Sequence, residues 1–173
     1  MNTRIRFLLI FFFLVLGIIL HVQLGLSSAW YLYLSVFILL GTHFLFGNIW
    51  AAFSMLKKGK IEEAETLVNQ IKRPEFLAKK PRAYYHFIKG MIALQQEELK
   101  EGEIHLVQAL ERGLRSPNDN ALTALNIAHI YFKQEKLDPC RSYLKQSKAF
   151  KPNDLMIKQK IEELERVLAT PYN

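Results

Sequence analysis

The side chains that could carry out chemistry are few, and they do not form a catalytic constellation. The single cysteine, Cys140, occupies a position in a helical pattern that requires a small buried residue, so we interpret it as a core residue rather than a nucleophile. Ser116 lacks the strand–turn–helix context of a hydrolase nucleophile. Adjacent glutamates such as Glu62 and Glu63 diverge by about 100° on a helix and cannot act as an acid–base pair. We therefore predict no enzymatic activity.

The histidines do not indicate a metal or a haem site. His86, His105 and His129 lack the short spacings of metal ligands, and the chain contains no CxxC or HExxH motif. His21 and His43 lie in apolar segments, but at different distances from the turn between those segments. In an antiparallel pair they would sit at different depths and could not face each other. The sequence predicts no cofactor.

The charge of the chain is positive but dispersed. The formal net charge is +7, and all 16 acidic residues lie from Glu62 onward, interleaved with lysine and arginine. The basic clusters are short and are not interleaved with aromatic residues, so no nucleic-acid partner is expected. One cysteine excludes an intramolecular disulfide and is consistent with a reducing compartment.

The first part of the chain contains two apolar segments. The first covers about residues 5–26 and the second begins at residue 29, with only residues 25–28 between them. About 20 helical residues span roughly 30 Å, the thickness of the hydrocarbon core of a bilayer. The sequence therefore predicts an N-terminal two-helix transmembrane hairpin within residues 1–56, with spans at about 5–26 and 29–53. A membrane surrounding this hairpin would be the first partner of the chain.

The charges that flank the hairpin indicate its orientation. Arg4 and Arg6 precede the first segment, while Lys57, Lys58 and Lys60 follow the second. The positive-inside rule then places both termini and the downstream domain in the cytoplasm. The three lysines would meet anionic headgroups, each contributing about 1 kcal/mol of attraction. We expect an integral membrane protein. The short connections between its helices favour a bacterial origin, in which case it would lie in the inner or plasma membrane.

A signal peptide is the alternative interpretation of the first apolar segment. Two arginines, an apolar core and the Ser27–Ala29 stretch resemble such a peptide with its cleavage site. A second apolar segment follows at once, which favours the hairpin. Cleavage would leave the residues from Lys57 onward in the cytoplasm as well.

Beyond the hairpin the chain shows an internal repeat of helical character. The small residues Ala52, Gly90 and Ala128 follow one another at intervals of 38 positions. Two further series keep the same step: Ala64, Gly102, Cys140; and Ile61, Leu99, Leu137. A fixed period of this size indicates stacked helix pairs.

This pattern resembles the tetratricopeptide repeat (TPR) family, whose units are antiparallel helix pairs of about 34 residues. The small residues match the positions where paired helices of that family cross closely. The turn glycine of the family is present only as Gly59, since Glu97 and Glu135 replace it, and Pro152 matches the proline that closes a unit. The tryptophan expected near the start of each unit is missing. The resemblance implies TPR-like units at about 46–74, 83–115 and 121–152, and a capping helix at 154–169.

The resemblance also implies a groove that binds protein partners, formed by the first helix of each unit. The family positions map onto mostly apolar residues in the second and third units: Tyr84, Phe87, Met91, Leu94, Leu122, Leu125, His129 and Phe132. An apolar groove suits an amphipathic or extended hydrophobic segment. The alternative, equally supported by the sequence, is that these residues pack against other helices of the same chain.

Taken together, these patterns predict an all-α protein with an N-terminal transmembrane hairpin and a TPR-like domain at about 46–173. Its predicted function is that of a membrane-tethered adaptor without catalysis. The alternative is a structural or assembly subunit of a larger membrane complex that binds through its hairpin. The run from Trp30 to Ile71 contains no proline. The second membrane helix is therefore expected to extend into the first repeat unit, unless it breaks near residues 50–60.

Overall fold

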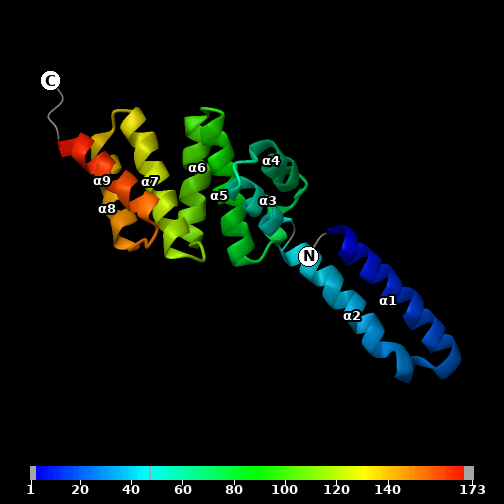
Figure 1. Ribbon diagram of the computed structural model, residues 1–173. Helices are drawn as coiled ribbons and strands as arrows, with labels where there is room; N and C mark the ends of the chain where they lie inside the picture. The colour runs from blue at the N-terminus through cyan, green and yellow to red at the C-terminus, as the bar shows by residue number, and fades with distance from the viewer. Residues whose placement is uncertain (1–2, 47, 170–173) are drawn as a thin grey trace.

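The protein is all-α, as the sequence predicts. The computed structural model describes residues 3–46 and 48–169, and within these ranges it contains helices and no strand. Figure 1 shows two parts: a long helical hairpin at the N-terminus and a stack of shorter helices that leads away from it to the C-terminal helix.

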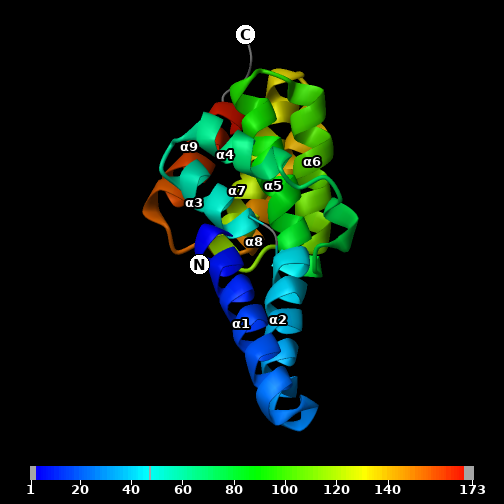
Figure 2. The same cartoon turned by 90° about the vertical axis from the view of Figure 1, so that its right-hand side faces the viewer.

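The hairpin consists of α1 (Thr3–Leu24) and α2 (Leu26–Phe46), which lie side by side in both views (Figures 1 and 2). Gly25 alone separates them, with a φ of +83° that favours glycine. The turn is therefore tighter than residues 25–28. Near the middle of α1, a Cβ on Gly17 would lie 3.3 Å from the Tyr33 ring, so this glycine lets the two helices approach closely.

The helices of the hairpin are apolar over most of their length. Classification as a membrane span requires sufficient length as well as apolar character. Among the residues that the structure describes, no helix combines the length and the apolar character needed to cross a membrane. The structure contains the predicted two-helix hairpin, α1 and α2.

The expected continuity between the second apolar helix and the first repeat unit is wrong. Helix α2 ends at Phe46, and a separate helix, α3 (Ile49–Lys57), follows. Asn48 precedes α3 and donates a hydrogen bond of 2.8 Å to the side chain of Gln70, which tethers the start of α3 to the repeat stack. Ile49 is fully buried in the core of that stack. The apolar residues beyond residue 48 thus pack within the protein. Hydropathy alone does not distinguish such residues from residues that contact lipid.

The repeat stack contains three helix pairs and a final helix. The pairs are α3 with α4 (Ile61–Asn69), α5 (Lys79–Gln95) with α6 (Leu99–Arg112), and α7 (Pro117–Lys133) with α8 (Leu137–Ala149). A short 3-10 turn, η1 (Pro74–Phe76), connects the first two pairs, and α9 (Leu155–Ala169) packs on α7 and α8. These bounds fall within a few residues of the three predicted units and the predicted capping helix.

The turns inside the three pairs confirm the period of the sequence repeat. Gly59, Glu97 and Glu135 all adopt a left-handed conformation, with φ values of +74°, +62° and +59°. In each turn, the next residue donates a backbone hydrogen bond of about 3 Å to a carbonyl five residues earlier: Lys60 to Met55, Glu98 to Ala93, Lys136 to Tyr131. This arrangement ends a helix and satisfies its last carbonyls. The pattern recurs at a spacing of 38 residues, as does the sequence pattern.

Two of these turns hold a glutamate in a conformation that glycine adopts at no steric cost. A non-glycine residue in the left-handed region costs roughly 1–2 kcal/mol, partly offset by the greater freedom of glycine in the unfolded chain. We therefore expect Glu97→Gly to raise the free energy of unfolding by about 0.5–1 kcal/mol, measured by urea denaturation. Gly59→Ala, the reverse change at the equivalent turn, should lower it by about 1 kcal/mol or more. Equal stability of both variants and the wild type would contradict the assignment of these turns.

The core of the stack is continuous from α3 to α9. One cluster of buried residues extends from Ile49 through α5 and α6 to Ile130, and a second joins α7, α8 and α9. Tyr131 and Tyr143 pack against both clusters and stack on each other with ring centroids 5.6 Å apart. Cys140 is fully buried, as predicted, and burial raises the pKa of its thiol. Both properties make it an inert core residue.

Candidate partner-binding surfaces

The structure closes much of the predicted groove. Three of its residues lie in the core, with exposed fractions of 2% for Tyr84, 3% for Phe87 and 1% for Leu125. Trp50 and Phe53 of α3 cover Tyr84, with ring centroids 4.9 and 4.7 Å from that of Tyr84. The prediction that these three residues line an open groove is wrong. The aromatic side chains of the preceding unit occupy the space that a partner would need.

The other predicted groove residues are only partly available. Met91, Leu94, Leu122 and Phe132 are half-buried and pack against the two core clusters, whereas His129 is exposed. The structure therefore does not bring the eight residues together as one apolar groove. For most of this face it supports the alternative that the residues pack within the chain.

Behind the aromatic cluster lies a polar network that joins three units. The Tyr84 hydroxyl donates a hydrogen bond of 2.5 Å to the Asp119 carboxylate and accepts one of 3.3 Å from the Arg115 backbone N–H. The Arg115 guanidinium lies 4.9 Å from the centre of the Trp50 ring. Burial and the neighbouring Asp119 carboxylate raise the pKa of Tyr84 well above its usual range. These contacts hold α3, α5 and the start of α7 together. Ser116, excluded above as a nucleophile, accepts a hydrogen bond from the Asp119 N–H and caps α7.

A histidine pair was missed by sequence reasoning. The Nδ1 atoms of His86 in α5 and His105 in α6 lie 3.1 Å apart, and one ring donates to the other. The Glu101 carboxylate lies 3.7 Å from the Nε2 of His105. No group of three metal-ligating side chains occurs among the described residues. Residues 86 and 105 face each other because α5 and α6 are antiparallel, a signal available only once the pairing is known.

The pair should make stability dependent on pH. Burial and the neighbouring charges of Arg112, His105 and Arg82 lower the pKa of His86 to about 4, and burial also lowers that of His105. The unfolded chain takes up these protons near pH 6.5, whereas the folded protein resists them until lower pH. Stability should therefore fall as the pH drops from about 6.5 towards 4.

Replacing His86 with glutamine tests this expectation. Since the imidazole is only half-buried, we expect the wild type to lose about 1 kcal/mol more than His86→Gln between pH 7 and pH 5. Urea denaturation at several pH values measures the difference. Parallel curves for the two proteins would exclude His86 as a source of the acid sensitivity.

Two of the three lysines predicted to meet a membrane surface have partners in the chain. Lys60 forms a hydrogen-bonded ion pair of 2.6 Å with Glu63, and the Lys57 ammonium lies 5.5 Å from the centre of the Phe53 ring. Lys58 is exposed. All three lie at the far end of α3, roughly 14 Å of helix beyond its start. Arg4 and Arg6, the other residues used to predict the orientation, have side chains outside the described part of the structure, and so does His43.

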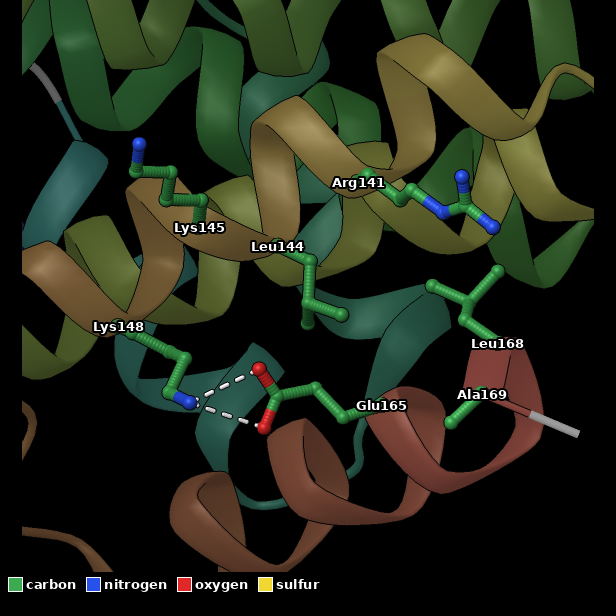
Figure 3. Close-up of a pocket in the computed structure, with 7 residues that line it drawn as sticks. All are labelled: Arg141, Leu144, Lys145, Lys148, Glu165, Leu168 and Ala169. Carbon is green, nitrogen blue, oxygen red and sulfur yellow. Dashed lines mark hydrogen bonds and ion pairs between the residues drawn. The ribbon is translucent and has the colours of Figure 1, made fainter.

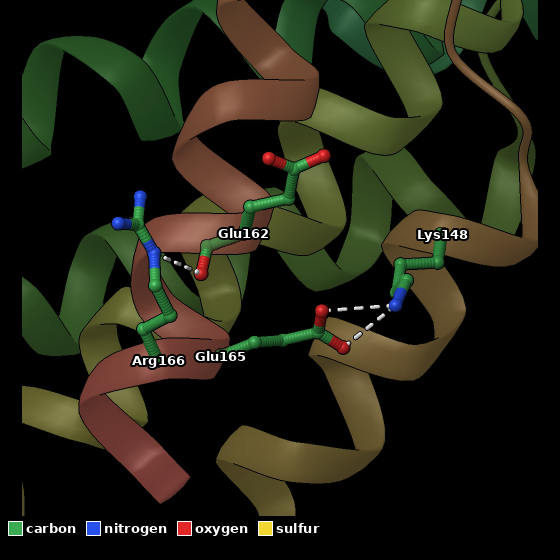
Figure 4. A network of polar contacts seen from close by, with 4 residues as sticks. All are labelled: Lys148, Glu162, Glu165 and Arg166. Carbon is green, nitrogen blue, oxygen red and sulfur yellow. Dashed lines mark hydrogen bonds and ion pairs between the residues drawn. The ribbon is translucent and has the colours of Figure 1, made fainter. Parts of the chain in front are cut away.

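A concave site lies between α8 and α9. This cleft has a volume of about 630 Å³, and Figure 3 shows its lining, which is Arg141, Leu144, Lys145, Lys148, Glu165, Leu168 and Ala169. Lys148 faces Glu165 across it and donates hydrogen bonds of 2.8 and 2.9 Å to the two carboxylate oxygens (Figures 3 and 4). On α9, Arg166 donates a hydrogen bond to the backbone carbonyl of Glu162 (Figure 4).

A second hollow of about 460 Å³ continues from the cleft past Lys148 and is lined by Lys151, Lys158 and Glu162 among others. The combined surface is predominantly basic. Sequence reasoning missed it because these residues are scattered through a mixed-charge segment. The available signal is the spacing of Arg141, Lys145 and Lys148, which at i, i+4 and i+7 share one face of a helix.

Comparisons of this chain with models of protein families, with curated proteins and with solved structures find no match. The class of protein is therefore described by its fold alone. It is an all-α protein in which helix pairs repeat every 38 residues and follow a helical hairpin.

Proposed function

We propose that this protein is a membrane-tethered adaptor. In this proposal the hairpin of α1 and α2 is embedded in the bilayer, both termini lie on the cytoplasmic side, and the TPR-like stack presents its surface to protein partners. No catalytic group takes part.

The observation that carries the proposal is the apolar surface of the hairpin. Its two helices bury few large side chains between them and leave many exposed: Leu8, Phe11, Phe12, Leu14, Val15, Ile18, Ile19, Val22, Leu24, Leu26, Trp30, Tyr31, Leu34, Phe37 and Ile38. Soluble monomers rarely expose a continuous apolar surface of this extent. A lipid environment removes the cost of exposing it to water. The stack, by contrast, has a charged and solvated exterior.

Extraction of membranes at alkaline pH tests the tether. Phe12→Arg combined with Phe37→Arg places two charges on the exposed faces of α1 and α2, at about 2.5–3.5 kcal/mol each in a bilayer centre. We expect the wild type to stay with the membrane pellet and the double variant to appear in the soluble fraction. The matched control, Phe76→Arg with Ile104→Arg, changes side chains that are 57% and 58% exposed on the stack and should leave the distribution unchanged. Release of the wild type itself would refute the tether.

Crosslinking in native membranes followed by mass spectrometry tests the adaptor role. Partner peptides attached to residues of the α3–α9 stack support it. Crosslinks confined to residues 3–46 would instead support a subunit that assembles through its hairpin. Labelling a cysteine introduced at Ser27 with a membrane-impermeant reagent reports the side on which the turn lies, since Cys140 is buried and unreactive.

A further inference from the structure

We propose that the cleft between α8 and α9 binds a short acidic segment of a partner protein that also carries an apolar side chain. This inference rests on the adaptor function proposed above and names the chemistry of the partner and the place where it binds.

The charge of the cleft is the first argument. Arg141 and Lys145 stand at its rim, and neither forms an ion pair with any residue that the structure describes. Lys148 is the only cation of the cleft with a carboxylate partner in that part of the chain, Glu165. The neighbouring hollow adds the two cations Lys151 and Lys158 and one carboxylate, Glu162, so the combined surface keeps an excess of positive charge. A ligand that brings carboxylates would complement this excess of positive charge.

The cleft also has an apolar floor. Leu144 is 3% exposed, and in Figure 3 it and Leu168 point into the space between the helices. An apolar side chain of the ligand can remove the remaining apolar surface from water, while carboxylates on either side of it reach the rim. The combination favours a segment of mixed acidic and apolar character over a simple anion.

Comparison with the preceding repeat unit shows that positive charge is unusual at these positions of α8. The positions 38 residues before Lys145 and Lys148 hold Val107 and Leu110 of α6, which are apolar and pack against the first core cluster. The last seam of a stack must become polar to stay soluble, but this requires no single sign of charge. The exposed residues of α9 outside both hollows show the mixed alternative, with Lys160, Glu163 and Arg166. End-capping alone therefore accounts for the polarity of the cleft and not for its positive charge.

The position of the cleft selects a protein ligand. Figure 1 shows α8 and α9 at the end of the stack opposite the hairpin, so the bilayer that holds the hairpin does not supply the anions. Among the residues that the structure describes, no aromatic ring lines the cleft. Binding of single-stranded nucleic acid relies on such rings to stack the bases. Carboxylates of a protein segment remain as the complementary group.

Binding is measured with the full chain in lipid nanodiscs and a fluorescein-labelled peptide of glutamate and leucine, by fluorescence anisotropy. We expect saturable binding that weakens with rising salt. The same peptide with glutamine in place of glutamate should bind about tenfold more weakly, because it lacks the charge. A peptide with serine in place of leucine should also lose affinity.

Variants locate the site. Arg141→Glu with Lys145→Glu should lower the affinity at least about tenfold, and both side chains are exposed, so the fold is retained. The matched control, Lys72→Glu with Lys100→Glu, changes the net charge equally at exposed positions elsewhere and should have little effect. Glu165→Gln frees Lys148 and should tighten binding several-fold. A purely structural role for the Lys148–Glu165 pair does not predict this gain.

Two results would overturn the inference: equal binding by the rim variant and its control, or a preference for a single-stranded oligonucleotide over the acidic peptide. Neither would affect the extraction and crosslinking tests of the adaptor. Failure of those tests alongside specific peptide binding would remove the membrane role and leave the cleft.

Discussion

Replacing Gly90 with valine is expected to lower the free energy of unfolding by about 3 kcal/mol, one of the largest effects of a single change in this protein. Gly90 lies where α5 crosses α6. A Cβ at this position would lie 2.7 and 2.8 Å from side-chain carbons of Leu106 and 3.1 Å from its backbone nitrogen. The side chain can move aside only partly because it is fully buried, and the backbone cannot move without separating the helices.

Urea denaturation followed by Trp50 fluorescence measures this loss, and a double-mutant cycle identifies its cause. Leu106→Ala removes the atoms that a new side chain would meet. The combination with Gly90→Val should therefore cost clearly less than the sum of the two single changes. Gly41→Ala is the matched control, since nothing lies within 4 Å of a Cβ at that helical glycine. Additive costs in the cycle would show that the crossing does not depend on close contact at Gly90.

This close crossing explains why the repeat was predictable from the sequence. Ala52 and Ala128 are fully buried, and Gly90 lies against the backbone of α6, so each position favours a small residue, a requirement that acts on one residue at a time. The turns inside the pairs are also constrained one residue at a time. Gly59, Glu97 and Glu135 adopt the same left-handed conformation at the same interval, although only the first is a glycine. Local constraints of this kind are visible in one sequence.

The features that were not predicted depend on contacts between units. Hydropathy does not tell a lipid-facing residue from a core residue, so the end of α2 at Phe46 was missed and Ile49 was assigned to the membrane helix. The groove was mapped from a family in which that face is open. Here Trp50 and Phe53 of the first unit close it over Tyr84.

The histidine pair and the basic cleft were not predictable from the sequence either. His86 and His105 meet only because two antiparallel helices bring residues 19 positions apart into contact. Arg141 and Lys148 form part of a basic cleft only because α9 turns back along α8. Neither arrangement leaves a motif in the sequence, since each depends on which helix faces which.

The second large effect is expected at Tyr84, where hydroxyl and ring contribute separately. Tyr84→Phe removes the donor to Asp119 and the acceptor for the Arg115 N–H, and leaves a part-buried carboxylate without this partner, at a cost of about 1.5–3 kcal/mol. Tyr84→Ala also removes the ring packed between α3 and α5, and should cost about 4–5 kcal/mol in total.

Denaturation curves of the two variants, compared with Tyr85→Phe, separate these contributions. Tyr85 is the adjacent, half-buried tyrosine, and its hydroxyl forms no hydrogen bond with the described residues, so its loss should cost little. Because Tyr84 contacts Trp50 and Phe53 of α3, its truncation should also loosen the first unit before the others unfold. In a Trp30→Phe background, Trp50 is the only tryptophan, and its fluorescence would report this as a separate early transition. Equal costs for Tyr84→Phe and Tyr85→Phe would mean that the polar network does not join the units. In that case the aromatic packing alone holds the first helix pair, the one nearest the hairpin, to the rest of the stack.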